Sequence, residues 1–266
     1  MSATRPGPRP EPSADISPPR TFWARVEYDG TDFYGFQVQT GKRTVQGEIE
    51  RALQEITGSN ARVIGAGRTD RGVHARGQVV SFQVGWRHER SELQRALNAV
   101  LEADVAIQKM GVATEGFHPR FSAVRRSYRY TLLIQEWRSP LARRTAWQMA
   151  QELDVERMAQ ASRWLVGTQD YATFGRPPQG ENTVRTVYRA EWQKRDSMLT
   201  FDIEANAFLY RMVRSIVGML VLVGRGQILP DEFGGILGSR ERGLVKQVAP
   251  AQGLCLTRVD YPEGVL

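Results

Sequence analysis

A single carboxylate stands in a loop that is rich in glycine and arginine. Asp70 is the only acidic residue between Glu55 and Glu89, and four arginines surround it in the sequence: Arg62, Arg68, Arg71 and Arg76. Nearby positive charge favours the ionised carboxylate, which is a competent covalent nucleophile. A second interpretation is that Asp70 only braces a turn through its own backbone. The loop alone does not separate these two interpretations.

The glycines of this loop allow positive φ angles and the close approach of a large ligand. Gly65-Ala66-Gly67 begins like a dinucleotide-binding fingerprint, but Asp70 stands in the place of the third glycine, where its charge would repel a pyrophosphate. The sequence contains no Gly-Lys-Ser/Thr triplet, which excludes a P-loop. We therefore expect no nucleotide cofactor.

The composition favours an anionic partner. The 266 residues carry 36 Lys and Arg against 29 Asp and Glu, a formal net charge of +7. Nearly all of the positive charge is arginine, because the only lysines are Lys42, Lys109, Lys194 and Lys246. Arginine suits bidentate phosphate contacts and stacking on bases. A GC-rich genome produces the same bias, so the charge alone favours a nucleic acid only modestly.

Several classes of protein are disfavoured by what the sequence lacks. Cys255 is the sole cysteine, which rules out a disulfide framework and fits a reducing cytoplasm. His74, His88 and His118 lack the spacing of metal ligands, so we expect them to lie at the surface or form hydrogen bonds, and we expect no metal. The N-terminus lacks the apolar segment of a signal peptide, and the apolar run 216–223 is shorter than the ~20 residues of a membrane span. We expect a cytoplasmic protein with no membrane contact.

Helices and strands that precede and follow the Asp70 loop in the sequence must position it. Residues 1–20 contain six prolines and little apolar mass, which predicts a disordered tail. In the first half, periodicity predicts helices that begin after Thr44 and Ser91, and strands over residues 22–28, 62–66, 78–84 and 105–112. The second half shows the same order, with helices after Asp154 and over 208–223, and strands over 126–134, 183–192, 198–205 and 254–261. Each half reads βαββαβ.

This order predicts an α+β fold of two tandem ferredoxin-like halves, with mainly antiparallel sheets that meet at a central cleft. The domains would span residues 21–113, which carry the Asp70 loop, and residues 114–266. The loop 29–39 contains Phe33, Tyr34 and Phe36, which could hold bases or form a packed turn.

Two arginines interrupt the most apolar predicted helix. Arg211 and Arg214 are three residues apart and would share one side of it. Helical periodicity alone favours the interpretation that both are solvated. The functional alternative is that one of them crosses the cleft and pairs with Asp70.

Short motifs occur in a fixed order from about Tyr28 to Pro262. They are Tyr28-Asp-Gly-Thr, Gly35-Phe-Gln37, Thr44-Val-Gln46, Gly67-Arg-Thr-Asp70, Gly72-Val-His-Ala75, Phe117-His118, Arg120-Phe-Ser-Ala123, Tyr128-Arg-Tyr130, Asn206-Ala-Phe208, Met212-Val-Arg214, Ile216-Val-Gly218 and Asp260-Tyr-Pro262. In this order they resemble the TruA family of tRNA pseudouridine synthases. These enzymes isomerise uridines 38, 39 and 40 of the tRNA anticodon stem-loop.

The resemblance implies roles for individual residues. Asp70 would be the catalytic nucleophile, Tyr128 would pack against the target base and help to move a proton, and Arg214 would pair with the aspartate. From the residues alone, Tyr128 could equally be a core tyrosine. Leu254 would line the uracil pocket. The family uses no cofactor and no metal, and typically acts as a homodimer.

A uridine in a stem must be flipped out of the base stack before it reacts. Arg68 and Arg71 are our candidates for filling the vacated space or gripping the flanking phosphates. The chain departs from the family where it has Phe36 for a usual Trp, Arg71 for an often small residue, and Gln252-Gly253-Leu254-Cys255 for Glu-Gly-Leu-Tyr. These departures concern RNA contacts and the pocket edge, not the reaction.

Two other functions remain to be compared. A non-catalytic RNA-binding module on a ferredoxin-like sheet would carry an aromatic-rich RNP strand, which neither half has, and it would have no use for Asp70. A nucleotide-dependent enzyme would need a phosphate loop. The residues leave open whether Asp70 attacks C6 of uracil or C1′ of ribose.

Overall fold

The computed structural model describes residues 18–178 and 180–266, so most of the predicted tail lies outside the described residues. The first half contains β1 (Arg20–Tyr28), α1 (Val45–Thr57), β2 (Ile64–Gly65), β3 (His74–Val84), α2 (Arg90–Val100) and β4 (Val105–Val112). This confirms the predicted order of strands and helices. Thr44 caps α1 as expected, because its hydroxyl accepts from the Gly47 amide at 3.3 Å.

The second half contains β5 (Arg125–Ile134), β6 (Trp147–Met149), α3 (Val155–Arg163), β7 (Gly167–Asp170), β8 (Val184–Arg195), β9 (Met198–Ala205), α4 (Met212–Gly224), α5 (Pro230–Ser239) and β10 (Leu254–Asp260). Asp154 caps α3 as predicted, and β8 and β9 form the predicted hairpin. The sequence analysis did not predict β6, β7 or α5.

Four elements have boundaries that differ clearly from the predictions. The N-cap of α2 is Glu89 instead of Ser91, because the Glu92 carboxylate accepts a hydrogen bond from the Glu89 amide at 3.2 Å. β2 is only two residues long, and β3 begins four residues earlier than expected. The long apolar helix begins at Met212 instead of Phe208, since Tyr210 forms a β-bridge with Arg176.

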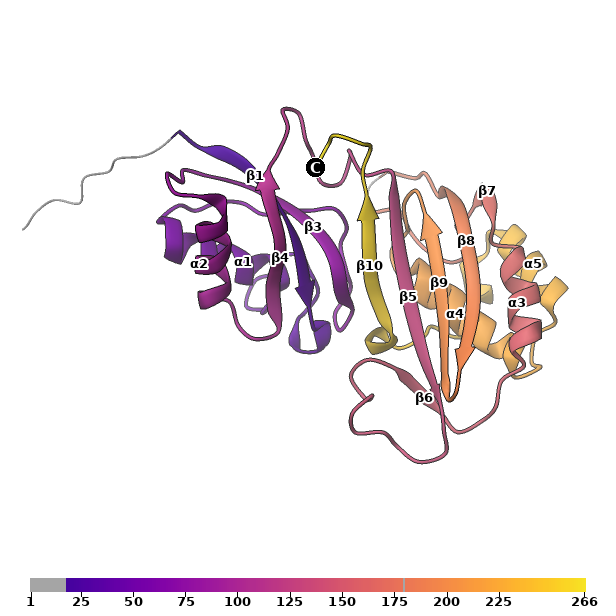
Figure 1. Ribbon diagram of the computed structural model, residues 1–266. Helices are drawn as coiled ribbons and strands as arrows, with labels where there is room; N and C mark the ends of the chain where they lie inside the picture. Colours follow the sequence, from indigo (N-terminus) through magenta and orange to yellow (C-terminus); the bar gives the residue numbers. More distant parts are fainter. Residues whose placement is uncertain (1–17, 179) are drawn as a thin grey trace, which may run out of the picture.

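The strands form one sheet in the order β4-β1-β3-β10-β5-β9-β8-β7, with β2 added to β3 and β6 added to β5. Neighbouring strands on this path are antiparallel except β3 and β10, which pair in parallel through Cys255–His74 and Leu256–Ala75. The expected mainly antiparallel α+β fold is therefore confirmed. The two halves do not carry separate sheets, however: β10 joins them edge to edge (Figure 1).

Helix α4 is the most deeply buried helix near the junction. Every residue from Met212 to Gly224 is buried except Arg214. Burial of α4 confirms the predicted apolar face and leaves one charged side chain on an otherwise apolar helix. Such a side chain requires a polar partner. Among the described residues, no helix is long and apolar enough to cross a membrane.

Candidate functional site

Arg214 pairs with Asp70 across the junction of the two halves. Its Nη1 lies 3.0 Å from the Asp70 Oδ2, and both side chains are mostly buried, with 16% and 18% of their surfaces exposed. This confirms the predicted pairing and excludes the fully solvated interpretation for Arg214. Arg211 has no ion pair with Asp70; it precedes the helix, in a left-handed conformation with φ 61°.

The backbone of the Asp70 loop is held from both sides. The Tyr28 hydroxyl lies 2.8 Å from the Thr69 Oγ1, and the Phe36 amide donates to the Thr69 carbonyl oxygen at 3.1 Å. The Asp70 carbonyl oxygen accepts from the Val73 amide at 3.1 Å and closes a turn. The turn is thus made by the backbone of Asp70, while its carboxylate is used in the contact with Arg214. The interpretation that the side chain only braces the turn does not describe this geometry.

His74 joins this loop to the second half. Its Nδ1 accepts from the Gly30 amide at 3.0 Å, and its Nε2 lies 2.8 Å from the Arg144 carbonyl oxygen and 3.1 Å from that of Gln252. An Nδ1 that accepts leaves the proton on Nε2, where it can be donated to either carbonyl. His74 is therefore a buried hydrogen-bonding residue, one of the two roles expected for the histidines.

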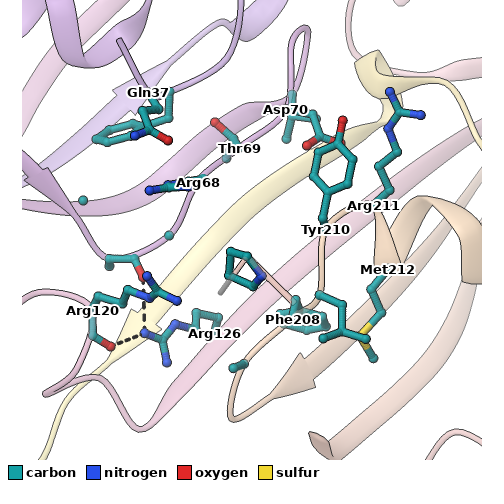
Figure 2. Close-up of a pocket in the computed structure, with 18 of the residues that line it drawn as sticks. Gln37, Arg68, Thr69, Asp70, Arg120, Arg126, Phe208, Tyr210, Arg211 and Met212 are labelled. Atoms are coloured by element: carbon teal, nitrogen blue, oxygen red, sulfur yellow. Dashed lines mark hydrogen bonds between the residues drawn. The ribbon is translucent and has the colours of Figure 1, made fainter. Parts of the chain in front are cut away.

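A cavity of about 1130 Å³ opens beside the ion pair. Asp70, Arg214, Tyr128 and Leu254 all line it. Figure 2 shows Arg68, Thr69 and Asp70 on the wall formed by the first half, opposite Phe208, Tyr210 and Arg211 from the second half. The structure therefore brings together the residues that the resemblance singled out, which lie up to 184 positions apart (254 − 70).

Tyr128 is buried in the wall of this cavity. Its ring meets that of Phe208 edge to face, with centroids 5.0 Å apart and planes at 87°. Burial raises the pKa of the Tyr128 phenol well above its usual value, with smaller contributions from Tyr28 and Asp70. The phenol is therefore neutral at physiological pH and keeps its proton available for hydrogen bonding or transfer.

Arg68 and Arg71 are both exposed at the cavity. The Arg71 guanidinium carbon lies 4.2 Å from the centroid of the Tyr34 ring, a cation–π contact. Of the three aromatics in loop 29–39, Phe33 and Phe36 are buried, as the packed-turn interpretation expected, and Tyr34 is the one that remains accessible.

The cavity carries far more positive than negative charge. Besides Arg214, eight arginines line it, and within the described residues none has a carboxylate within 4.0 Å: Arg62, Arg68, Arg71, Arg120, Arg126, Arg176, Arg185 and Arg211. Nearby, burial and the positive charges of Arg176 and Arg211 lower the pKa of Arg242. Sequence reasoning assigned no role to Arg120, Arg126, Arg176 and Arg185. Arg120 stands in one of the quoted motifs, which was the available signal, whereas nothing in the local pattern of the other three distinguishes them from other arginines. Their uncompensated charge suits a polyanion.

The described residues contain no group of three or more His, Cys, Asp or Glu side chains that could hold a metal ion. The side chains gathered at the site provide an ion-paired carboxylate, a neutral phenol and an apolar wall. Covalent attack by the carboxylate on a ligand enclosed in the cavity is the reaction this set supports.

Comparisons of the sequence with known proteins show which family the chain resembles. Residues 24–122 and 161–262 match the family described as tRNA pseudouridine synthase. The chain is 46% identical to tRNA pseudouridine synthase A of Chloroflexus aurantiacus over 253 residues, which cover 93% of this chain and 91% of the relative. It is 44% identical to the enzyme of that name from Roseiflexus castenholzii over 92% of each chain. The corresponding Thermoanaerobacter enzyme is 39% identical, over 89% of this chain and 97% of the relative.

The chain therefore belongs to the tRNA pseudouridine synthase family, whose members are isomerases that convert uridine in tRNA to pseudouridine. The family resemblance proposed from the motifs is confirmed.

Proposed function

We propose that this chain isomerises uridines 38, 39 and 40 in the anticodon stem-loop of tRNA, with Asp70 as the nucleophile. The observation that carries the proposal is the ion pair of Asp70 with Arg214 in a large cavity lined by unpaired arginines. Arg214 fixes the direction of the Asp70 carboxylate through the contact at 3.0 Å. The surrounding guanidinium groups supply the phosphate contacts that an RNA substrate needs.

The reaction balances without a co-reactant. The N1–C1′ bond breaks, a C5–C1′ bond forms, and one proton leaves C5 while another is placed on N1. Asp70 can attack either C6 of uracil or C1′ of ribose, and it is released when the new glycosidic bond is complete. Tyr128, as a neutral phenol beside the pocket, packs against the base and assists the proton movement.

The substrate uridine has to leave the base stack, which costs a few kcal/mol. Leu254, buried at the cavity, provides an apolar wall for the flipped uracil. Arg68 and Arg71 are exposed next to the nucleophile, where they can occupy the vacated space or hold the flanking phosphates.

We further propose that the scaffold consists of two tandem ferredoxin-like halves, residues 21–113 and 114–266. The βαββαβ order of the main elements in each half supports this division. The functional unit would be a homodimer acting in the cytoplasm, in which one tRNA contacts both subunits. Sedimentation of the protein with and without tRNA tests the dimer.

The test of the activity compares wild-type protein with Asp70→Asn on unmodified tRNA transcripts. Pseudouridine is mapped by carbodiimide adducts and primer-extension stops, because it has the same mass as uridine. We expect stops in the anticodon stem-loop with wild type and none with Asp70→Asn, which should still bind tRNA. Stops outside the stem-loop would refute the proposed positions, and an active Asp70→Asn enzyme would refute the nucleophile. RNA binding without stops from either protein would favour a binding module.

A further inference from the structure

A pair of aromatic rings on the cavity wall has no part in the site described above. His118 and Phe121 lie in the connection between β4 and β5, and both line the cavity. Their ring centroids are 4.3 Å apart with planes at 32°. Phe121 is nevertheless 74% exposed, so most of its surface has no protein neighbour. A phenylalanine in this state offers a flat, accessible apolar surface inside a cavity that also carries many arginines.

The segment that carries these rings is held by hydrogen bonds within itself. The His118 Nδ1 accepts from the amides of Arg120 at 3.1 Å and Phe121 at 3.3 Å. The His118 amide donates to the Ser122 Oγ at 3.1 Å, and the Ser122 amide donates to the His118 carbonyl oxygen at 2.9 Å. The imidazole is therefore fixed in its orientation, and Phe121 projects from a closed turn.

A buried guanidinium fixes this turn relative to the Asp70 loop. Arg126 has no carboxylate within 4.0 Å in the part of the chain that the structure describes. It donates to four backbone carbonyl oxygens, those of Ala66, Arg120, Ala123 and Asn206. Ala66 lies four residues before Asp70, and Arg120 is next to Phe121. Figure 2 shows Arg126 bonded to Arg120 on the pocket wall. The exposed Phe121 ring is therefore held in a fixed position relative to Asp70.

The surroundings of Phe121 match one kind of ligand. The Arg120 guanidinium carbon lies 5.5 Å from the centroid of the ring, and Arg120 and Arg185 have no carboxylate within 4.0 Å among the described residues. Proteins that bind unpaired nucleotides combine aromatic rings, on which bases stack, with cations that follow the backbone phosphates. An apolar peptide would gain nothing from these unpaired cations.

We propose that His118 and Phe121 form a stacking subsite for a nucleobase of the RNA other than the uridine that reacts. Flipping the target unstacks its neighbours, and a neighbouring base is the ligand that becomes available at this moment. The proposed subsite depends on the proposed function, because its ligand is a base of the tRNA substrate. It binds this base and takes part in no reaction.

The test is a double-mutant cycle between the protein and the RNA. Synthetic anticodon stem-loops carry one abasic nucleotide at each position flanking the target in turn. Their dissociation constants and kcat/KM are measured with wild type, Phe121→Ala and Phe121→Tyr. Trp137→Ala is the matched control, because Trp137 is 78% exposed in the β5–β6 connection and does not line the cavity.

We expect Phe121→Ala to weaken binding of the intact stem-loop about tenfold, the effect of losing one base–aromatic stack. Phe121→Tyr should restore binding, and Trp137→Ala should leave it unchanged. One abasic position should weaken binding to wild type by a similar factor and leave binding to Phe121→Ala unaffected, because both changes remove the same contact.

Additive losses at every abasic position would overturn the subsite, as would unchanged binding in Phe121→Ala. A Phe121→Ala protein that sediments as a smaller species would also overturn it and assign Phe121 to contact with a second copy. These results are separable from failure of the proposed function. If wild type makes no pseudouridine, the dissociation constants still test the stacking contact, and if Phe121→Ala changes nothing, the activity of wild type stands.

Discussion

Arg214 and Ala249 are joined by two hydrogen bonds in opposite directions. The Ala249 amide donates to the Arg214 carbonyl oxygen at 2.9 Å, and the Arg214 Nε donates to the Ala249 carbonyl oxygen at 2.8 Å. The guanidinium is therefore fixed along one edge to the backbone, while Nη1 meets Asp70. This planar geometry, with separate nitrogens for the two contacts, is available to arginine and not to lysine.

Arg214→Lys should lower kcat by at least ~100-fold, because a single ammonium group cannot hold both contacts and Asp70 loses its fixed direction. Arg214→Ala should abolish turnover, while both variants still bind tRNA. Single-turnover rates and filter binding measure the two effects. Arg225→Lys, at the other end of the same helix, should keep wild-type kcat. An active Arg214→Ala enzyme would contradict the proposal that catalysis needs the pairing of Arg214 with Asp70.

Arg126→Gln should lower the free energy of unfolding by about 3 kcal/mol, since it leaves buried carbonyl oxygens without donors. The neighbouring Arg125 is partly exposed and pairs with Glu204 at 3.1 Å. Arg125→Gln should therefore cost less than about 1 kcal/mol. Urea unfolding of both variants provides the comparison. Equal losses would mean that the four carbonyl contacts of Arg126 contribute no more than a surface ion pair.

Gly35→Ala should disturb the Asp70 loop. Gly35 has φ +92°, and an added Cβ would lie 2.7 Å from the Thr69 carbonyl oxygen. We expect a loss of about 1–3 kcal/mol in the free energy of unfolding, with a lower kcat in the folded enzyme. Gly67→Ala, within the Asp70 loop itself, is the control, because its Cβ would have no atom within 4 Å. Similar stability for the two variants would show that the contact between Gly35 and Thr69 is easily relieved.

Arg176→Gln and Arg211→Gln should each weaken tRNA binding and reduce the slope of log Kd against log salt by about 1, as expected for the loss of one phosphate contact. Arg189→Gln is the control, because Arg189 pairs with Glu191 at 2.8 Å and does not line the cavity. Titrations at several salt concentrations measure the slope. An unchanged slope in both cavity variants would remove these arginines from the RNA-binding surface.

The unfolding free energy should fall at alkaline pH, in part because of Tyr128. Burial raises the pKa of this phenol, so the folded protein retains a proton that the unfolded chain loses above pH ~10. The stabilisation is complete below pH ~10 and declines above it, by up to ~1.4 kcal/mol per pH unit. Tyr128→Phe should show a shallower decline in urea unfolding between pH 9 and 11. An unchanged decline would mean that Tyr128 ionises equally easily in both states.

The sequence predicted the order of the elements because each long helix and strand has a clear hydrophobic period. The pairing of Asp70 with Arg214 could not be predicted in this way. Helical periodicity favoured solvated side chains for Arg211 and Arg214, and only the resemblance to the TruA family selected Arg214 as the partner of Asp70. The short strands β6 and β7 carry too few residues to show a period, and they were missed.

Arg126 shows what local sequence patterns cannot reveal. Its four partners are carbonyl oxygens, which every residue possesses, and they come from segments as distant as Ala66 and Asn206. No side-chain type marks such a site in advance. The left-handed backbone of Arg211 was also missed. It directly follows Tyr210, which forms a bridge with Arg176, a residue distant in the sequence.

The position of β10 also has a consequence during translation. This seven-residue strand lies between β3 and β5 and joins the two parts of the sheet, yet it is synthesised after both. A nascent chain thus contains Asp70 long before Arg214, which follows 144 residues later, and before the strand that joins the two parts of the sheet. A polypeptide released by the ribosome before β10 is made would carry Asp70 without an assembled cavity, and we expect such a fragment to be inactive.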